Sequence, residues 1–288
     1  MKRPASRTRI LAAVAPALLL FLLSSAVVPH LAGKAAAAEK APVFDVITVS
    51  AAITPPIAEY IVQGIREAAK NGSEGLILRL DTPGGLDLAM RDIAKEMLNA
   101  PVPVIVYVSP SGARAASAGV IITVAAHIAA MAPGTNIGAA HPVGIGIGGA
   151  MDKTMSQKVV NDAVAYVRGI AKKRNRNEDW VERAVRKSES ITAEEALRLK
   201  VVDFVAPDLD QLLKQADGRE VALAAGKKVL RTRGAVLKER AMGTRQRVLS
   251  TLSDPNIAYI LLLIGLAGLY FEFSTPGVIR PGVIGGIS

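Results

Sequence analysis

The stretch Asp81 to Gly85 (Asp-Thr-Pro-Gly-Gly) places two glycines between an apolar run and an amphipathic run. Glycines at the end of a strand leave backbone N–H groups open to a ligand, because no side chain covers them. Beside a helix N-terminus such groups suit an anion, either a phosphate or the oxyanion of acyl transfer. The sequence has no GxxxxGK[ST] motif, which counts against a nucleotide. An ordinary turn between strand and helix explains the same residues equally well.

A second stretch, Ser109 to Gly119, also follows an apolar run. Within it Ser117 is flanked by alanine and glycine, so a peptide could approach its hydroxyl closely. The competing interpretation is a serine that caps the next helix, which is the commoner role of such a residue. Either stretch alone is therefore a weak indication of catalysis.

Composition excludes several other chemistries. The 288 residues are 50% hydrophobic and 21% charged, which rules out a disordered chain. The chain contains no cysteine, so it has no disulfide, thiolate metal site or cysteine nucleophile, and its three histidines do not suggest a metal centre. An aromatic content of 4% argues against a stacking platform for single-stranded nucleic acid. We expect no metal, no cofactor and no nucleic-acid partner.

The elements that must position these residues lie between Ala41 and about Gly218, a size suited to one α/β domain. Apolar strands alternate with amphipathic helices, which favours parallel pairing. The expected strands are Phe44–Val49, Gly75–Leu80, Pro103–Val108, His127–Met131 and Val201–Val205. The expected helices are Ile57–Lys70, Leu86–Leu98, Ser117–Ala126 and Val159–Ala171, followed by a short helix opened by the capping box Thr192–Glu195.

Two apolar segments flank this domain. Four positive residues precede the run Ile10–Leu23, and small residues ending at Ala38 follow it, which is the pattern of a cleaved secretory signal. Near the other end, Pro255–Phe271 holds 17 residues without a charge and without a polar face, which favours a membrane helix over a buried core helix. An uncleaved N-terminal anchor is the alternative for the leader.

The formal charge of +10 is concentrated outside the α/β domain. Residues 214–247 carry ten positive side chains and three acids, and Lys227–Arg247 alone carries eight positives and one acid. The positive-inside tendency would place this segment in the cytoplasm, whereas a signal peptide places it outside. Either the segment packs on the domain, where its charge counts less, or the leader is not a signal peptide.

Together, Asp-Thr-Pro-Gly-Gly, a helix, a strand and Ala-Ala-Ser-Ala-Gly resemble the Clp-type and signal-peptide-peptidase serine proteases. Their order and spacing are most similar to the NfeD membrane-bound serine proteases, from about Val46 to Val205 and on into Tyr259–Gly286. The resemblance implies an α/β fold, a Clp/crotonase-like spiral of ββα units followed by the start of a transmembrane helical domain. It implies Ser117 as nucleophile. The backbone N–H groups expected near the oxyanion are those of Gly84, Gly85 and Ala118, and a β-branched residue at Gly85 is expected to impair turnover without unfolding the protein.

Three residues compete for the role of base. The resemblance to Clp proteases implies a Ser-His-Asp triad, in which His141 would be the base because it lies at a comparable spacing after the serine. No acid lies at a position that clearly suits the third member of such a triad. The resemblance to the NfeD proteases implies a Ser-Lys dyad instead, with the lysine at the start of a helix. Lys158 occupies that place, 41 residues after Ser117. Lys153 is the nearby alternative. A lysine acts as a base only when burial against apolar walls keeps it neutral, whereas an ordinary Lys158 would pair with Asp162 at i+4 on a solvated face.

The resulting expectation is a membrane-anchored serine endopeptidase with its protease domain on the extracytoplasmic side. The resemblance implies hydrophobic, stomatin-like membrane proteins as substrates or partners, and a homodimer or larger homo-oligomer. The alternatives are a non-catalytic scaffold for stomatin-like assemblies and a crotonase-fold acyl-transfer or hydratase enzyme. The expected parts are a signal peptide (1–38), a Clp-like serine protease domain (39–218), a basic linker (219–254) and the start of a membrane domain (255–288) that looks truncated.

Overall fold

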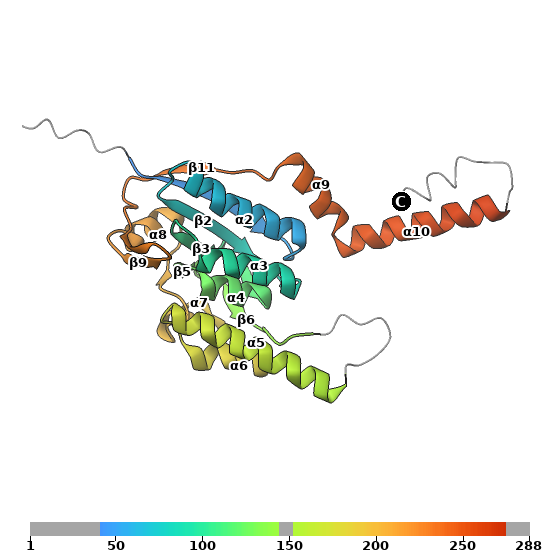
Figure 1. The fold of residues 1–288 in the computed structure, drawn as a ribbon, viewed down its shortest axis with the longest axis horizontal. Coiled ribbons are helices and arrows are strands. Elements are labelled where there is room, and N and C mark those ends of the chain that lie inside the picture. The colour runs from blue at the N-terminus through green and yellow to red at the C-terminus, as the bar shows by residue number, and fades with distance from the viewer. Residues whose placement is uncertain (1–40, 144–151, 275–288) are drawn as a thin grey trace, which may run out of the picture. The chain divides into compact units, whose positions relative to one another are not determined.

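Figure 1 shows the computed structural model of the chain, which describes residues 41–143 and 152–274. Its centre is a parallel sheet of six strands in the order β11-β1-β2-β3-β5-β8. The strands are β1 (Val43–Ser50), β2 (Gly75–Asp81), β3 (Val104–Val108), β5 (Ile128–Met131), β8 (Phe204–Val205) and β11 (Val236–Glu239). The central strands are nearly continuous apolar runs because helices cover both faces of the sheet.

The two faces of the sheet bury different sets of side chains. On one face, residues such as Ile47, Leu78 and Val106 pack against the helices α2, α3 and α4. On the other face, Phe44 and Ile77 belong to a smaller cluster that includes residues of α8. These helices are α2 (Pro55–Lys70), α3 (Asp87–Leu98), α4 (Ala118–Ala125) and α8 (Leu209–Ala216). The alternation expected from the sequence is therefore confirmed (Figure 1).

A second, three-stranded sheet lies between the central sheet and a pair of helices. Its strand β4 (Arg114–Ala116) runs parallel to β6 (Asn136–Gly138), which pairs antiparallel with β7 (Ser190–Thr192). The helices α5 (Lys153–Lys173) and α6 (Glu178–Arg186) pack on each other, and α7 (Ala193–Arg198) opens with both bonds of the expected capping box. The small sheet matters because β4 ends immediately before Ser117.

Three elements differ from the sequence expectation. The helix expected at Val159–Ala171 begins at Lys153, because its first turns are solvated and carry no apolar stripe that a sequence pattern could detect. The strand expected at Val201–Val205 shortens to β8, because the Val201 and Val202 N–H groups both donate to Ala196 O at the end of α7. The helix α6 has no counterpart in the expectation, although the Asn177 side chain caps it by accepting from Trp180 N.

The segment expected as a basic linker, 219–254, is largely structured. It forms the hairpin of β9 (Glu220–Leu223) and β10 (Gly226–Val229), then β11 at the edge of the central sheet, then the helix α9 (Thr244–Leu252). Five of its positive side chains pair with acids that precede the segment, and a sixth pair, Lys227–Glu220, lies within the hairpin. The five pairs are Lys228–Glu74, Arg231–Glu74, Arg233–Asp217, Arg240–Asp45 and Arg245–Glu59. The basic segment thus packs on the domain, which removes the conflict with an N-terminal signal peptide.

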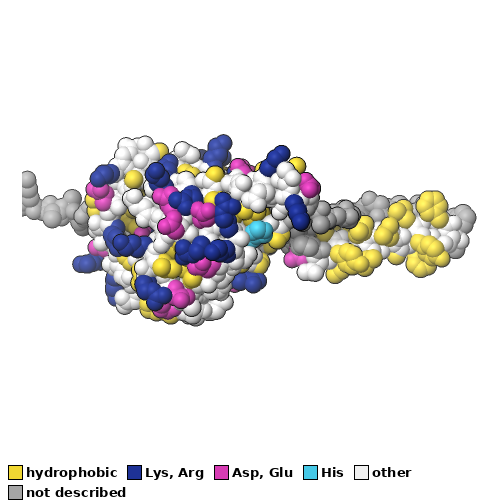
Figure 2. Space-filling model, turned by 90° about the horizontal axis from the view of Figure 1, so that it is seen from below, with side chains coloured by type: hydrophobic (Ala, Val, Ile, Leu, Met, Phe, Trp, Pro, Cys, Tyr) yellow, Lys and Arg dark blue, Asp and Glu magenta, His cyan; other side chains and the backbone are white. Residues whose placement is uncertain are grey.

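The surface charge of the domain has no single sign. Figure 2 shows Lys and Arg side chains interspersed with Asp and Glu over the face in view, whereas apolar side chains are gathered along the helix α10 (Pro255–Ser274). Within 41–143 and 152–274, no helix on its own has the length and hydropathy of a membrane span. The consecutive segments Thr244–Leu252 and Asn256–Phe271, bent by 70°, reach those values together. The leader expected at 1–38 lies outside the described residues.

Two arginines cap the C-terminal end of α4 by donating hydrogen bonds to its carbonyl oxygens. Arg176, buried apart from a small edge, donates to the carbonyl oxygens of Val124, Ala126 and Val201 and pairs with Asp203. Arg174 donates to Ala125 O and Met97 O. Both satisfy carbonyls that the helix end leaves unpaired, and positive charge there complements the helix dipole.

His127 lies beside these arginines and is held neutral. Its Nδ1 accepts from Val104 N–H at 3.1 Å, and a terminal nitrogen of Arg174 lies 3.2 Å from Nε2. Burial, and then the charge of Arg174, lower the pKa of His127 from 6.5 to about 3. A protonated ring would also face N–H donors at both of its nitrogens, which disfavours it further.

His127 predicts a loss of stability in mild acid. The unfolded chain binds a proton at His127 below about pH 6.5 and the folded chain does not, so its contribution is complete above that pH and declines toward pH 3. At about pH 5 the loss relative to neutral pH should be about 2 kcal/mol. Urea unfolding in detergent, followed by the fluorescence of the buried Trp180, measures it. The His127→Gln variant should lack this component, and equal pH slopes for both proteins would contradict the assignment.

Candidate active site

The loop that follows β2 is clamped from two sides. Thr82 N donates to Arg114 O at 2.8 Å, and Ala116 N donates to Thr82 O, so one side of the loop pairs with β4. On the other side Ile53 N donates to Gly84 O at 2.7 Å, and Leu86 N donates to Ile53 O. The loop is therefore fixed relative to the start of both α3 and α4.

Neither glycine of this loop could carry a side chain. Gly84 has a φ of +123°, and a Cβ there would lie 2.7 Å from the Cβ of Ser117. A Cβ at Gly85 would lie 2.2 Å from the carbonyl oxygen of Ile53. The expectation that a β-branched residue at Gly85 leaves the fold intact is therefore wrong, because the substitution would force Ile53 and the loop apart.

Ser117 stands between β4 and α4 in an unusual backbone conformation. Its φ of 52° and ψ of −112° are rare for a residue with a side chain, and such strain costs of the order of 1–3 kcal/mol. Its N–H donates to Gly138 O at 3.0 Å, so the small sheet holds it in place. Ser117 also precedes α4 without capping it, which removes the alternative role considered from the sequence.

Two backbone donors near Ser117 are free. Gly84 N–H donates to the Thr82 hydroxyl at 3.2 Å. The N–H groups of Gly85 and Ala118, in contrast, have no hydrogen-bond partner among the described residues. Both residues line the same cavity as Ser117. Of the three expected donors, Gly85 and Ala118 are thus available to an oxyanion, and Gly84 supplies the close approach.

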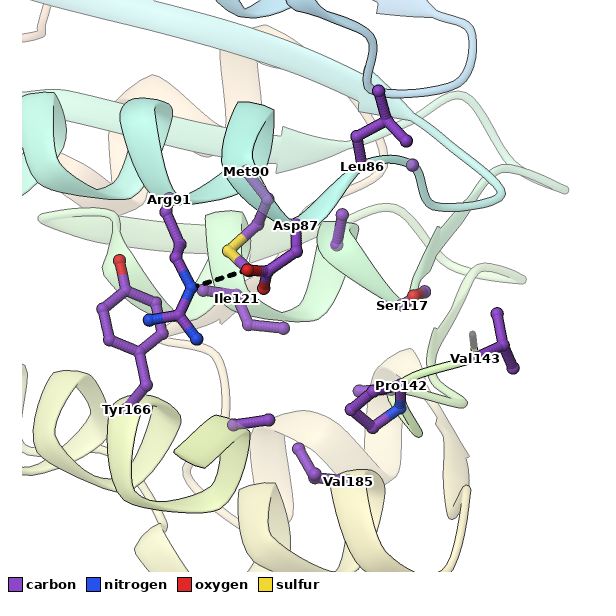
Figure 3. Close-up of a pocket in the computed structure, with 14 residues that line it drawn as sticks. Leu86, Asp87, Met90, Arg91, Ser117, Ile121, Pro142, Val143, Tyr166 and Val185 are labelled. Carbon is purple, nitrogen blue, oxygen red and sulfur yellow. Dashed lines mark hydrogen bonds and ion pairs between the residues drawn. The ribbon is translucent and has the colours of Figure 1, made fainter. Parts of the chain in front are cut away.

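The cavity beside Ser117 has a volume of about 190 Å³ and is mostly apolar (Figure 3). A cavity of about 150 Å³ holds a benzene molecule, so this one can hold a side chain of similar size. Its walls come from α3 and the two residues before it, from Ser117 and α4, from the segment 140–143, and from the helices α5 and α6. The apolar lining residues include Met90, Ile121, Ala140, Pro142, Ala163 and Val185.

Arg91 forms one end of the cavity, as Figure 3 shows. Its Nε donates to Asp87 at 2.8 Å, a terminal nitrogen donates to Asp162 on α5, and the guanidinium lies 4.3 Å from the ring centre of Tyr166. Burial lowers the pKa of Arg91, but the two carboxylates outweigh burial and leave that pKa above its ordinary value. Sequence reasoning did not single out Asp87, Arg91 or Tyr166. The i,i+4 spacing of Asp87 and Arg91 was the available signal.

The three candidate bases lie outside this cavity. His141 contacts Val185 O through Nδ1 at 2.9 Å, and it lines a separate cavity together with Lys153. Lys158 is exposed and lines a third cavity, which adjoins the first and shares Asp87 and Arg91 with it. None of these bases is hydrogen-bonded to Ser117 in the part of the chain that the structure describes. Met155, expected to cover Lys158, is itself exposed, and Met151 lies outside the described residues.

Across 41–143 and 152–274, no cluster of three or more His, Asp or Glu side chains is arranged to hold a metal ion. The arrangement that the structure does offer is a strained serine, two free N–H groups and an apolar cavity, which together suit acyl transfer.

Comparison with known proteins gives this geometry a context. Residues 43–224 match the family described as NfeD1b, N-terminal domain, and residues 256–288 match the NfeD integral membrane domain. The chain is 36% identical over 223 residues to the membrane-bound protease PH1510 of Pyrococcus horikoshii, covering 76% of this chain and 50% of that protein. It is 29% identical over 263 residues to the membrane protein NfeD1b of Bacillus subtilis, covering 87% of this chain and 55% of that one.

Solved structures agree with the fold. A lysine-to-alanine variant of the 1510-N membrane-bound stomatin-specific protease, in complex with a substrate peptide, matches with a TM-score of 0.69 at 32% identity, over 75% of this chain and 99% of that chain. A serine-to-alanine variant of the same protease matches with a TM-score of 0.63 at 32% identity, over 70% and 98%. The chain spans about half the length of the curated relatives it matches. With its N-terminal α/β domain and the membrane domain that follows, the chain belongs to the NfeD family.

Proposed function

We propose that the chain is a membrane-bound serine peptidase whose nucleophile is Ser117. The observation that carries this proposal is the position of Ser117, which has a strained backbone and lines an apolar cavity together with Gly85 and Ala118, whose N–H groups have no partner among the described residues. Strain of this kind persists only where the surrounding structure enforces it, and it is typical of catalytic residues. The similarity to PH1510, named a membrane-bound protease, supports the same reaction class.

We propose Lys158 as the base. The serine and the lysine replaced in the two solved structures lie 41 positions apart in their own chain, as do Ser117 and Lys158. His141 is a weaker candidate because its Nδ1 is engaged by Val185 O and no acid among the described residues is bonded to it. In the free chain Lys158 is exposed, so it becomes a base only when a bound peptide or a second copy of the chain covers it.

The reaction proceeds in two acyl-transfer steps. Ser117 Oγ attacks the scissile carbonyl carbon, and its proton passes to the neutral amine of Lys158. The carbonyl oxygen becomes an oxyanion that the N–H groups of Gly85 and Ala118 stabilise. Lys158 returns the proton to the leaving amine, which leaves an ester on Ser117. Water, deprotonated by Lys158, then hydrolyses this ester and restores the free hydroxyl.

The apolar cavity favours a hydrophobic side chain next to the scissile bond. A relative in complex with a substrate peptide is named a stomatin-specific protease, so we propose a stomatin-like membrane protein as substrate. We further propose a protease domain over about 39–218 that acts on the extracytoplasmic side, behind a cleaved leader. The strands of 219–239 complete that domain, and association into a homo-oligomer would help to cover Lys158.

The dyad predicts non-additive effects of substitution. Ser117→Ala and Lys158→Ala should each abolish cleavage of a quenched fluorescent peptide rich in leucine, and the double variant should be no worse, because the two residues act as one unit. His141→Ala serves as the control and should retain substantial activity. Near-full activity in Lys158→Ala together with an inactive His141→Ala would establish the triad instead. Parental activity in Ser117→Ala would show that Ser117 is not the nucleophile, and a parent chain without any cleavage would favour the scaffold.

The nature of the base also predicts the pH dependence. The working form of Lys158 is the deprotonated amine, so the rate of peptide cleavage should still be rising in the alkaline range. A histidine base would level off near neutrality. The rate of peptide cleavage between about pH 6 and 10 decides between them, and a plateau at pH 7 would be incompatible with Lys158.

The placement of the domain can be tested on the whole chain because it has no cysteine. A single Lys95→Cys substitution puts a thiol on the exposed face of α3, away from the cavity. If the domain is extracytoplasmic, a membrane-impermeant maleimide should label this thiol in intact cells as fully as in permeabilised cells. Labelling only after permeabilisation would place the domain in the cytoplasm.

A further inference from the structure

The cavity that Lys158 lines is bounded by four charged side chains. Asp87 and Arg91 come from α3, and Lys158 and Asp162 come from α5. The third described side of this cavity, Pro142 and Val143, contributes no charge. Among the described residues of this cavity, only Asp87, Arg91 and Asp162 can therefore exert an electrostatic effect on Lys158.

Arg91 binds both carboxylates at once. Its Nε binds Asp87, and stacking on Tyr166 fixes the plane of the guanidinium (Figure 3). A terminal nitrogen of the same guanidinium binds Asp162. Arg91 is also the least exposed of the three, at 29%, against 60% for Asp87 and 67% for Asp162. It thus reaches across from α3 to a carboxylate that lies on the same helix as Lys158.

Asp162 follows Lys158 by four residues, so the two side chains are neighbours on one face of α5. At this spacing an exposed lysine and aspartate ordinarily form an ion pair. Among the described residues, however, the ion pair of Asp162 is with Arg91, and Lys158 has none. Arg91 occupies the carboxylate that would otherwise bind the proposed base.

We propose that Arg91 is a positioning residue that keeps Asp162 and Asp87 away from Lys158, so that its amine can lose a proton and reach Ser117. The inference rests on the proposed role of Lys158. With Arg91 present, one positive charge offsets one of the two negative charges that face the cavity, and each carboxylate has an ion-pair partner. Without Arg91, two unpaired carboxylates face Lys158, hold its protonated form and draw the amine toward solvent.

The sign of the effect follows from this charge count. A nearby opposite charge favours the charged form of a lysine, and one within about 4–6 Å shifts a pKa by about 1–3 units. Loss of Arg91 should therefore move the alkaline rise of Ser117 reactivity to higher pH. At a fixed pH below the half-rise, each unit of this displacement lowers the reactive fraction about tenfold.

The test measures the nucleophilicity of Ser117 directly. The full chain in detergent is treated with a small fluorophosphonate, and the second-order rate of Ser117 labelling is recorded from about pH 6 to 11. A small probe does not fill the apolar cavity, so a change in the shape of that cavity leaves the pH at which labelling half-rises unaffected. Trp180 fluorescence verifies the fold of each variant.

In Arg91→Met, which preserves the apolar contact with Tyr166, the half-rise of labelling should move about one unit to higher pH, while the rate at the alkaline plateau stays near that of the parent. At pH 8 this amounts to a roughly tenfold loss. Adding Asp162→Asn should recover most of the loss. Asp162→Asn alone should change the rate less than about twofold, since Arg91 already occupies Asp162. Arg91→Lys, which keeps the charge, should move the half-rise least.

Each other outcome has a definite meaning. If Lys158→Ala removes the alkaline rise but Arg91→Met leaves it in place, the role given to Arg91 is wrong and the dyad stands. If Lys158→Ala keeps the parental rise, the dyad itself is wrong. A loss in Arg91→Met at every pH, not recovered by Asp162→Asn, would show a structural role only. Should Arg91→Met fail to fold, Arg91→Gln provides the same comparison.

Discussion

The site depends on one close approach of backbone to backbone. The chain at Gly84 and Gly85 passes so near Ile53 and Ser117 that a Cβ at either position would overlap its neighbours. Two hydrogen bonds with Ile53 and two with β4 hold the loop at that distance. This contact brings Gly85 to the same cavity as Ser117 and Ala118, the first residue of α4. Without it the proposed donor Gly85 and the proposed nucleophile would lie on separate parts of the fold.

The helix α4 connects Ser117 to the hydrophobic core. All of its residues are buried, and Arg174 and Arg176 satisfy the carbonyls at its C-terminal end. A buried arginine is costly unless its hydrogen bonds are complete, so Arg176 fixes the position of the helix end, and the half-buried Arg174 adds to this. His127 adds to the same region, since its neutral ring accepts from β3. Ser117 therefore stands at the start of a helix whose other end is anchored by polar contacts in the core.

Patterns local in sequence predicted most of the scaffold. The runs that became β1, β2 and β3, with α2 and α3 between them, are strongly periodic, and the Thr192–Glu195 capping box is present as expected. The pairing of β11 with β1 could not be predicted, because the paired residues, such as Val43 and Val236, are 193 positions apart and β11 is short and charged. The same limit applies to Arg91. On a helical surface it looks like any solvated cation, and its partner Asp162 is 71 residues away.

The proposed machinery divides into a rigid half and a weakly held half. Ser117 and its donors are fixed by strands and by a buried helix. Lys158, in contrast, lies on α5 before its first buried residue, Val160, whereas the rest of that helix packs through Val164, Val167 and Ile170. The ion pairs of Arg91 join this end of α5 to α3, and partly exposed pairs contribute only about 0.2–1 kcal/mol. So small an energy cannot hold the helix end rigidly, but it is enough to decide which partner Asp162 takes. A small difference in energy is therefore enough to control the proposed base, because that difference decides whether Asp162 pairs with Arg91 or with Lys158.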